Sequence, residues 1–262
     1  MSSGYGVGGV TDPLWFYLLA VPVVLLVGIS KGGFAGGLGT LAVPLLTLMV
    51  DPRMAAAIML PILCAMDIFS VWEYRRAWDR ETLKILIPGA VLGIVIGGLT
   101  FHVMNGDMIR IIVGAMSVYF VANYWFVQRR RGVVAPQPQN ALRGGILGGM
   151  SGFASFIAHA GGPPLSQYLF PLQLDKTRLV GTSVMFFIIV NYVKLIPYAW
   201  LGQLSFENLK ISLYLLPFAP LGVWLGIWLH NRVSNRFFYI VAYLLLFLVG
   251  VKLLAEGLYA LV

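Results

Sequence analysis

Five side chains that can bind an anion or move a proton interrupt apolar segments of this chain. Lys31 and His159 each lie within a glycine-rich break, and Asp67 lies deep in a long apolar run. Asn191 and Lys194 are three residues apart, which places them on one face of a helix. Ionisable residues inside membrane segments are costly and indicate functional sites. The lysines are suited to neutralise an anion, and Asp67 and His159 are candidate proton carriers.

Each of these residues also has a purely structural interpretation. Lys31 can be a lysine whose ammonium reaches the membrane surface, and Lys194 can lie at an interface because its apolar run ends soon after it. His159 can hold its turn by a hydrogen bond, and Asp67 can pair with a backbone amide or with an arginine of the 75–80 loop. No spacing among them resembles a catalytic triad or a metal-ligand set, so we expect no catalytic residue, no metal and no cofactor.

Two apolar segments broken by glycines must position these side chains. The first break runs from Gly28 to Gly39, and the second runs from Gly148 to Gly162. Lipid offers the backbone no hydrogen bonds, so irregular backbone survives at that depth only inside protein or against a watery cavity. A matched pair of such breaks is the best sequence indicator of the substrate site of a secondary transporter.

Each break is followed by a proline that favours the start of a returning helix, Pro44 in the first half and Pro164 in the second. Free N–H groups and the positive end of the helix dipole attract anions, so two converging helix N-termini predict one anion site. The alternative is that the glycines only allow helices to pack closely. Asp67 and His159 are the candidate proton-coupling residues. The candidate substrate-binding residues are Ser30, Lys31, Gly33, Phe34, Gly37, Gly39, Thr40, Ser155, His159, Gly161, Gly162, Asn191 and Lys194.

The composition places the chain in a membrane. Of its 262 residues, 59% are hydrophobic and 11% are charged, against roughly 25% charged in a soluble domain. The net charge of +8 comes from cations in short loops, so we expect a lipid bilayer around the protein and no nucleic-acid partner. The single cysteine, Cys64, excludes a disulfide within the chain. The sequence contains no Walker-type phosphate-binding motif, so transport would be secondary.

The apolar runs predict an all-α polytopic membrane protein of two inverted repeats. Each repeat is a glycine-broken hairpin of two short helices, which starts and ends on one side of the membrane, followed by three transmembrane helices. The alternative is one kinked crossing helix in place of each hairpin. The predicted elements are a first repeat over 1–130 (hairpin 14–50, spans 54–72, 84–101 and 108–127), a basic cytoplasmic linker over 131–140, and a second repeat over 141–262 (hairpin 142–172, spans 178–201, 209–229 and 237–254).

Recurring residues and loop charge indicate the inverted duplication. Asp51 and Asp175 open the first long span of each half, and Glu81 and Glu207 precede the next one. The arginines of the 75–80 loop and those of 129–143 fall two crossings apart, and arginine-rich loops stay in the cytoplasm. Equivalent loops of the two halves then face opposite sides of the membrane.

These features resemble the TauE/SafE sulfite exporter family of bacterial inner-membrane proteins over nearly the whole chain. The hallmarks are Lys31-Gly32-Gly33-Phe34 with the glycines after it, and Ser155-Phe156-Ile157-Ala158-His159-Ala160-Gly161-Gly162-Pro163-Pro164. The resemblance implies export of a small organic or inorganic sulfur anion, such as sulfite, sulfoacetate or a related sulfonate, by a multi-pass inner-membrane protein.

The sequence leaves alternative functions open, some of which fit the family resemblance and one of which does not. An importer of the same anions and an anion channel of the same architecture both fit it, and the oligomeric state can be monomer or homodimer. An intramembrane enzyme with Asp67 and His159 as acid and base is a rival, but no nucleophile accompanies these two residues.

Overall fold

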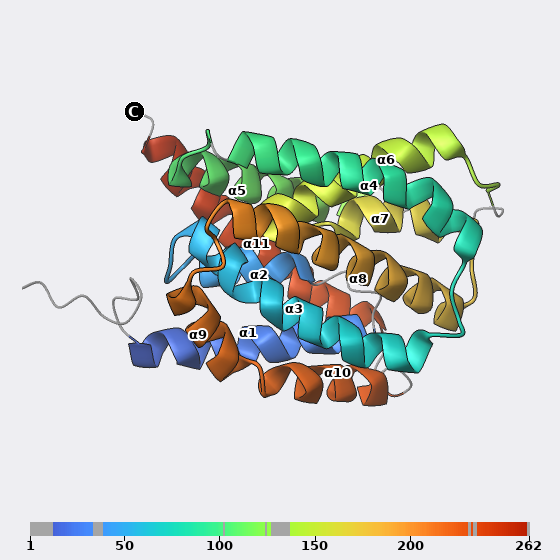
Figure 1. Ribbon diagram of the computed structural model, residues 1–262, viewed down its shortest axis with the longest axis horizontal. Helices are drawn as coiled ribbons and strands as arrows, with labels where there is room; N and C mark the ends of the chain where they lie inside the picture. The colour runs from blue at the N-terminus through green and yellow to red at the C-terminus, as the bar shows by residue number, and fades with distance from the viewer. Residues whose placement is uncertain are drawn as a thin grey trace, which may run out of the picture.

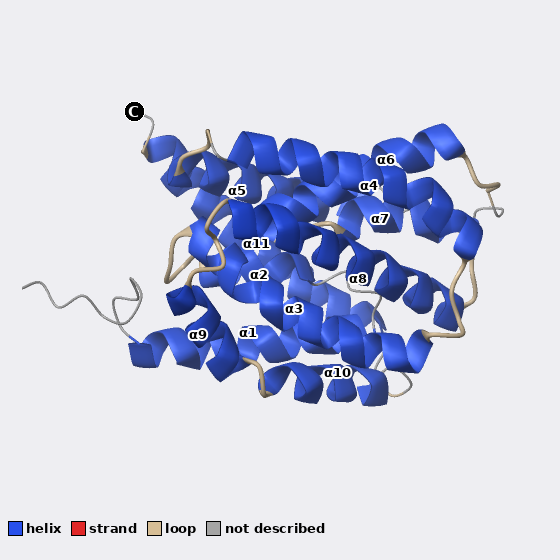
Figure 2. Ribbon diagram, viewed as in Figure 1, coloured by secondary structure: helices blue, strands red, loops and turns tan. Residues whose placement is uncertain are grey.

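The computed structural model describes residues 13–33, 39–101, 103–123, 125–126, 137–229, 232 and 235–260. Within these ranges the chain is helical and contains no strand, which confirms the predicted all-α class (Figures 1 and 2). The candidates Phe34 and Gly37, most of the basic linker, and Tyr124 and Val127 of the predicted span 108–127 lie outside the described residues. The elements are α1 (Pro13–Gly33), η2 (Gly39–Leu41), α2 (Ala42–Leu46), α3 (Pro52–Tyr74), α4 (Arg80–Phe101), α5 (Gly106–Asn123), α6 (Ala141–Ala158), α7 (Gly162–Leu169), η4 (Phe170–Leu172), α8 (Lys176–Trp200), α9 (Phe206–Leu215), α10 (Phe218–Leu229) and α11 (Asn235–Tyr259).

Polar N-cap residues define where several helices begin. Asp51 and Asp175 each accept a hydrogen bond from a backbone N–H in the first turn of α3 and α8, at 2.9 and 3.0 Å. Asn140 and Ser205 cap α6 and α9 in the same way. Such a cap satisfies an N–H group that the helix leaves unpaired. Both aligned aspartates therefore open the first long helix after a break.

Four of the described helices are long and apolar enough to cross a membrane, at Leu14–Gly33, Pro52–Tyr74, Arg80–Phe101 and Thr177–Trp200. The pair α9 and α10 gives a further candidate span that is bent by 44°. The predicted span 209–229 is thus built from two helices with a bend between them. Pro217 lies at the break and explains it, because proline lacks an N–H and its ring clashes with the carbonyl four residues earlier.

The first broken segment contains a longer helix than expected for a hairpin arm. α1 has 21 residues and covers about 31 Å at 1.5 Å per residue, which is close to the thickness of a membrane core. α2 has 5 residues and α7 has 8. Each break therefore joins one long helix to one short returning helix.

The loops gather at the two ends of the bundle (Figure 1). The chain enters α1 at the left-hand end of the view and, after α2, starts α3 at that same end. It enters α6 at the right-hand end and, after α7, starts α8 there. Each broken segment thus begins and ends at one end of the bundle, and the two segments use opposite ends.

The helices of one half pack mainly against helices of the other half. α1 lies against α10, α4 against α6, α5 against α11, and α3 against α8. Glycines permit the closest approaches: a Cβ atom at Gly28 would lie 2.7 Å from the Cα of Gly222, and one at Gly152 would lie 2.8 Å from the Cα of Ala90. Atoms do not approach that closely, so these contacts require glycine.

Asp79, which directly precedes α4, connects the two halves through polar contacts. Its carboxylate accepts hydrogen bonds from Arg178 Nη2 at 2.7 Å, Gln139 Nε2 at 2.9 Å and Thr82 N at 2.9 Å. Burial alone would raise the pKa of Asp79, but the hydrogen bonds and the charge of Arg178 outweigh burial and lower this pKa. The charged carboxylate thus links α4 to α8 and to the segment before α6.

Candidate functional site

The packing of α3 against α8 brings the polar side chains of Asp67 and Asn191 together. Asn191 Nδ2 donates a hydrogen bond to Asp67 Oδ2 at 2.6 Å. Lys31, in the last turn of α1, lies with its Nζ 2.5 Å from Asp67 Oδ1 and 3.4 Å from the carbonyl oxygen of Leu63. Asp67 is 0% exposed and Lys31 is 5% exposed. This first group is therefore a buried ion pair, in which each charge offsets the cost of burying the other.

Lys194, three residues after Asn191 on α8, forms a second buried polar group with α6. Its Nζ lies 3.0 Å from Ser155 O, 3.0 Å from Ser155 Oγ and 2.8 Å from His159 Nδ1. His159 Nε2 lies 2.9 Å from the carbonyl oxygen of Ala56. Because a carbonyl only accepts, the network assigns the proton to Nε2 and leaves Nδ1 to accept from Lys194. His159 is then neutral, and both of its ring nitrogens are engaged.

A protonated Lys194 gives these two groups together one more positive than negative charge. Lys31 and Asp67 balance each other, and the three acceptors around Lys194 are uncharged. Lys194 is 0% exposed, so water does not screen its charge. A charge in a low-dielectric interior acts far more strongly on a neighbouring ion than a charge in water does. The site is therefore electrostatically suited to an anion.

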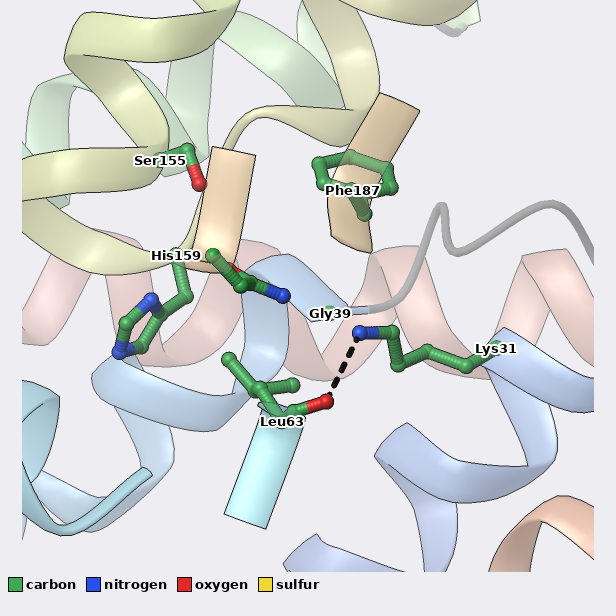
Figure 3. A pocket seen from close by; sticks show the side chains of 7 residues that line it. Lys31, Gly39, Leu63, Ser155, His159 and Phe187 are labelled. Atoms are coloured by element: carbon green, nitrogen blue, oxygen red, sulfur yellow. Dashed lines mark hydrogen bonds between the residues drawn. The ribbon is translucent and has the colours of Figure 1, made fainter. Parts of the chain in front are cut away.

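A small cavity lies between the two polar groups (Figure 3). Its volume, measured as the space that the centre of a water molecule can occupy, is about 20 Å³, which is room for about one water. Lys31 extends toward it from one side, and Ser155 and His159 lie on the other. The cavity is lined by Lys31, Gly39, Leu63, Ser155, His159, Phe187 and Asn191.

The two glycine-rich breaks meet at this cavity. A Cβ atom at Gly39 would lie 3.8 Å from the carbonyl oxygen of His159, which is van der Waals contact. His159 ends α6 in the left-handed conformation, with φ 52°, a conformation that costs a non-glycine residue energy. Tyr198 stacks on the imidazole, with 6.3 Å between ring centroids, and donates a hydrogen bond to Phe156 O at 2.7 Å. These contacts fix the imidazole beside Lys194.

The N-termini of the returning helices offer few hydrogen-bond donors. The first turn of α7 contains Pro163 and Pro164, which have no N–H, and the N–H of Leu165 bonds to the carbonyl of Gly161. α2 is short and contains Pro44. Side chains therefore supply most of the donors that an anion would meet here.

The structure brings together many of the predicted candidates. Ser30 and Gly33 lie at the end of α1, Thr40 lies in η2, and Gly161 and Gly162 lie at the start of α7; all five are buried but do not line the cavity. Phe34 and Gly37 lie outside the described residues. The candidates that meet at the cavity or beside it are Lys31, Asp67, Gly39, Ser155, His159, Asn191 and Lys194.

Two residues that line the cavity are absent from the predicted set. Leu63 lies four residues before Asp67, and Phe187 lies four residues before Asn191. Residues four apart on a helix share a face, so this spacing is the sequence signal that identifies both. Each contributes an apolar wall beside a polar group.

A comparison with protein families gives a match over most of the chain. The family described as Sulfite exporter TauE/SafE matches residues 3–253. The match includes both glycine-rich breaks and all residues that line the cavity. Neither the curated proteins nor the solved structures give a match.

Proposed function

Because the chain belongs to the TauE/SafE sulfite exporter family, we propose that it is a secondary transporter that exports a small organosulfur anion such as sulfite, sulfoacetate or a related sulfonate. One observation carries this proposal: the amine of Lys194, whose charge when protonated has no acidic partner among the described residues that it contacts, is buried next to the cavity where the two breaks meet. An anion is the ligand that balances this charge. Lys31, Asn191 and Ser155 are the further donors around it.

Charge balance gives the expected ligand charge. The two lysines supply two positive charges and Asp67 supplies one negative charge, so a monoanion makes the occupied site neutral. A hydrogen sulfite ion or a singly charged sulfonate satisfies this balance. A dianion would satisfy it only together with a proton, and Asp67 is the candidate to carry that proton.

The small size of the cavity supports a carrier rather than an open channel. A site with room for about one water does not admit a ligand with three oxygens, so the breaks must move relative to α3 and α8 during transport. Carriers alternate between such closed and open states, with the substrate near the bilayer midplane. An outward-moving anion is also favoured by the negative-inside potential, by about 2.3 kcal/mol per charge per 100 mV.

The proposed topology is that of two inverted repeats, over 1–130 and 141–262, with re-entrant breaks. It is supported by broken segments that use opposite ends of the bundle and by the equivalent pairings of α1 with α10 and of α6 with α4. The loop between α3 and α4, which contains Arg75 and Arg76, lies at the right-hand end of Figure 1. Arginine-rich loops stay inside, so we assign this end to the cytoplasm of a bacterial inner membrane.

Transport by proteoliposomes tests the proposal. Lys194→Met replaces the buried ammonium by an uncharged side chain of similar length, and we expect sulfite counterflow to fall roughly tenfold or more, the equivalent of about 1.4 kcal/mol. Lys210→Met, which removes an exposed lysine of α9, is the matched control and should leave counterflow unchanged. Equal losses in both variants would contradict the role of Lys194.

The same assay separates the alternatives. Saturable flux with counterflow supports a carrier, whereas flux that rises linearly with concentration and shows no counterflow identifies a channel. Chloride that competes as well as sulfite would contradict the substrate class. Uptake into inside-out vesicles but not into right-side-out vesicles, at a physiological potential, supports export.

A further inference from the structure

An open groove lies between the N-terminal part of α4 and the middle of α8, away from the central cavity. Its volume is about 400 Å³, in the same measure as above. It is open to the surface of the protein. The residues that line it are Trp78, Arg80, Leu83, Lys84, Ile87, Met185 and Ile189.

One end of the groove is basic. The guanidinium of Arg80 lies 5.3 Å from the centre of the Trp78 ring, and the indole of Trp78 donates a hydrogen bond to Arg75 O at 3.0 Å. Lys84, one turn further along α4, has 70% of its side chain exposed and is 2.8 Å from Glu81. With Arg76 also exposed in the preceding loop, the cations at this end outnumber the carboxylates.

The other end of the groove is apolar. Leu83 and Ile87 on α4 oppose Met185 and Ile189 on α8. Beyond them, both helices present exposed apolar side chains, for example Leu92 at 61% and Ile196 at 74%. Arg80 and Ile87 are seven residues apart, which is about 10 Å along the helix. The groove therefore changes from basic to apolar over the distance between a lipid headgroup and the start of its acyl chains.

We propose that this groove binds one acidic phospholipid of the leaflet that faces the 75–80 loop. Its phosphate would lie between Arg80 and Lys84, and an acyl chain would lie along Leu83, Ile87, Met185 and Ile189. A free phosphate would leave the apolar wall uncovered, and a zwitterionic lipid would leave the excess of basic charge unbalanced. Trp78, at the boundary, is the residue type that favours the headgroup level of a membrane.

A lipid bound in this groove would contact both α4 and α8. Asp79, which links α4 to Arg178 of α8, directly precedes Arg80. A phospholipid between the same two helices adds a second connection beside this ion pair. We therefore expect occupancy to stabilise the contact between the two halves at this end of the bundle.

Native mass spectrometry and thermal unfolding of the full chain in detergent test the proposal, with phosphatidylglycerol and phosphatidylcholine of identical acyl chains as the probes. We expect the wild-type protein to retain one phosphatidylglycerol and to unfold at a higher temperature with it than with phosphatidylcholine. In R80Q/K84Q the lipid-bound fraction should fall at least fivefold, and the difference between the two lipids should disappear. Binding is measured here without transport, so the result does not depend on the proposed substrate.

The chain offers a matched control. R232Q/K252Q removes an arginine that lies 4.3 Å from a tryptophan ring, that of Trp228, and a lysine paired with a glutamate, Glu256. This variant should bind phosphatidylglycerol like the wild type. Equal losses in both double variants would overturn the proposal, because net charge alone would then explain the binding.

A second pair of variants tests the apolar wall. Ile189→Trp places a large ring in the groove, whereas Ile196→Trp adds the same ring to an exposed position on the same helix. Only Ile189→Trp should reduce lipid binding. Displacement of the lipid by an equal concentration of glycerol phosphate would overturn the acyl-chain role, and a dimer that I189W abolishes would show that a second copy occupies the groove.

Discussion

At the scale of single residues, Asp67 decides how much positive charge the site retains. It is the acidic partner of Lys31 and also accepts a hydrogen bond from Asn191. An anion that enters the proposed site would compete with this carboxylate for Lys31. Asp67 would also have a benefit for transport. Without it, two unbalanced lysines would destabilise the empty site and would slow release of the anion.

Asp67→Asn should therefore bind a monoanion several-fold more tightly than the wild type and unfold at a lower temperature without ligand. The substitution removes a negative charge and leaves Lys31 unpaired in a low-dielectric interior. Thermal-shift titration with sulfite measures both effects. Asp107→Asn, which removes the carboxylate of the partly exposed pair with Arg110, is the control and should change neither quantity.

The pH dependence of transport by Asp67→Asn tests proton coupling at the same residue. His159 is a weaker candidate, because both of its ring nitrogens already have partners. We expect coupling, if the transported ligand is a dianion, to disappear in Asp67→Asn. A variant that keeps the wild-type pH profile would exclude Asp67 as the proton carrier.

At the scale of elements, glycines determine how close the broken segments lie to their neighbours. Gly28→Ala in α1 would place a Cβ atom 2.7 Å from the backbone of Gly222. Backbone atoms cannot yield locally, so we expect a loss of about 1–3 kcal/mol in stability. Gly145→Ala in α6 meets no atom within 4 Å and should be neutral or gain up to about 1 kcal/mol from helix propensity. Unfolding in detergent measures both, and equal effects would contradict the packing interpretation.

The contact between α4 and α8 depends on the charge of Asp79. Its pKa is lowered in the folded protein, so its stabilising effect is present above the pKa of the unfolded state and is lost as the pH falls through the folded pKa. Asp79→Asn should therefore cost on the order of 1 kcal/mol at neutral pH. The difference from the wild type should shrink below about pH 4. A difference that is constant from pH 7 to pH 3 would show that the carboxylate charge is not responsible.

At the scale of the whole molecule, the proposed inverted topology would make matching positions of the two halves face opposite sides of the membrane. Glu81 and Glu207 align when the sequences of the two halves are compared, and both are exposed. In a Cys64→Ala background, which removes the single cysteine, we expect Glu207→Cys to react with an impermeant maleimide in right-side-out vesicles. Glu81→Cys should react only in inside-out vesicles. Labelling of both from one side would contradict inverted repeats.

Much of this architecture follows from short-range signals in the sequence. Apolar runs give the helices, Asp51 and Asp175 give the starts of α3 and α8, and glycine runs give the two breaks. The bend at Pro217 is harder to predict from the sequence, because Pro61 and Pro88 lie inside helices that stay continuous. A proline weakens a helix locally, and packing decides whether the helix bends.

The sequence by itself determined the membrane class, the helical elements and the small set of polar residues that a bilayer makes costly. Only the tertiary structure decided which of these residues are partners: Lys31 with Asp67, and Lys194 with His159. The physical reason is the distance along the sequence over which each interaction acts. Hydropathy, capping and helix propensity act within a few residues, whereas the balance of buried charge depends on side chains that lie 35 or more residues apart and meet only when α1, α3, α6 and α8 pack together.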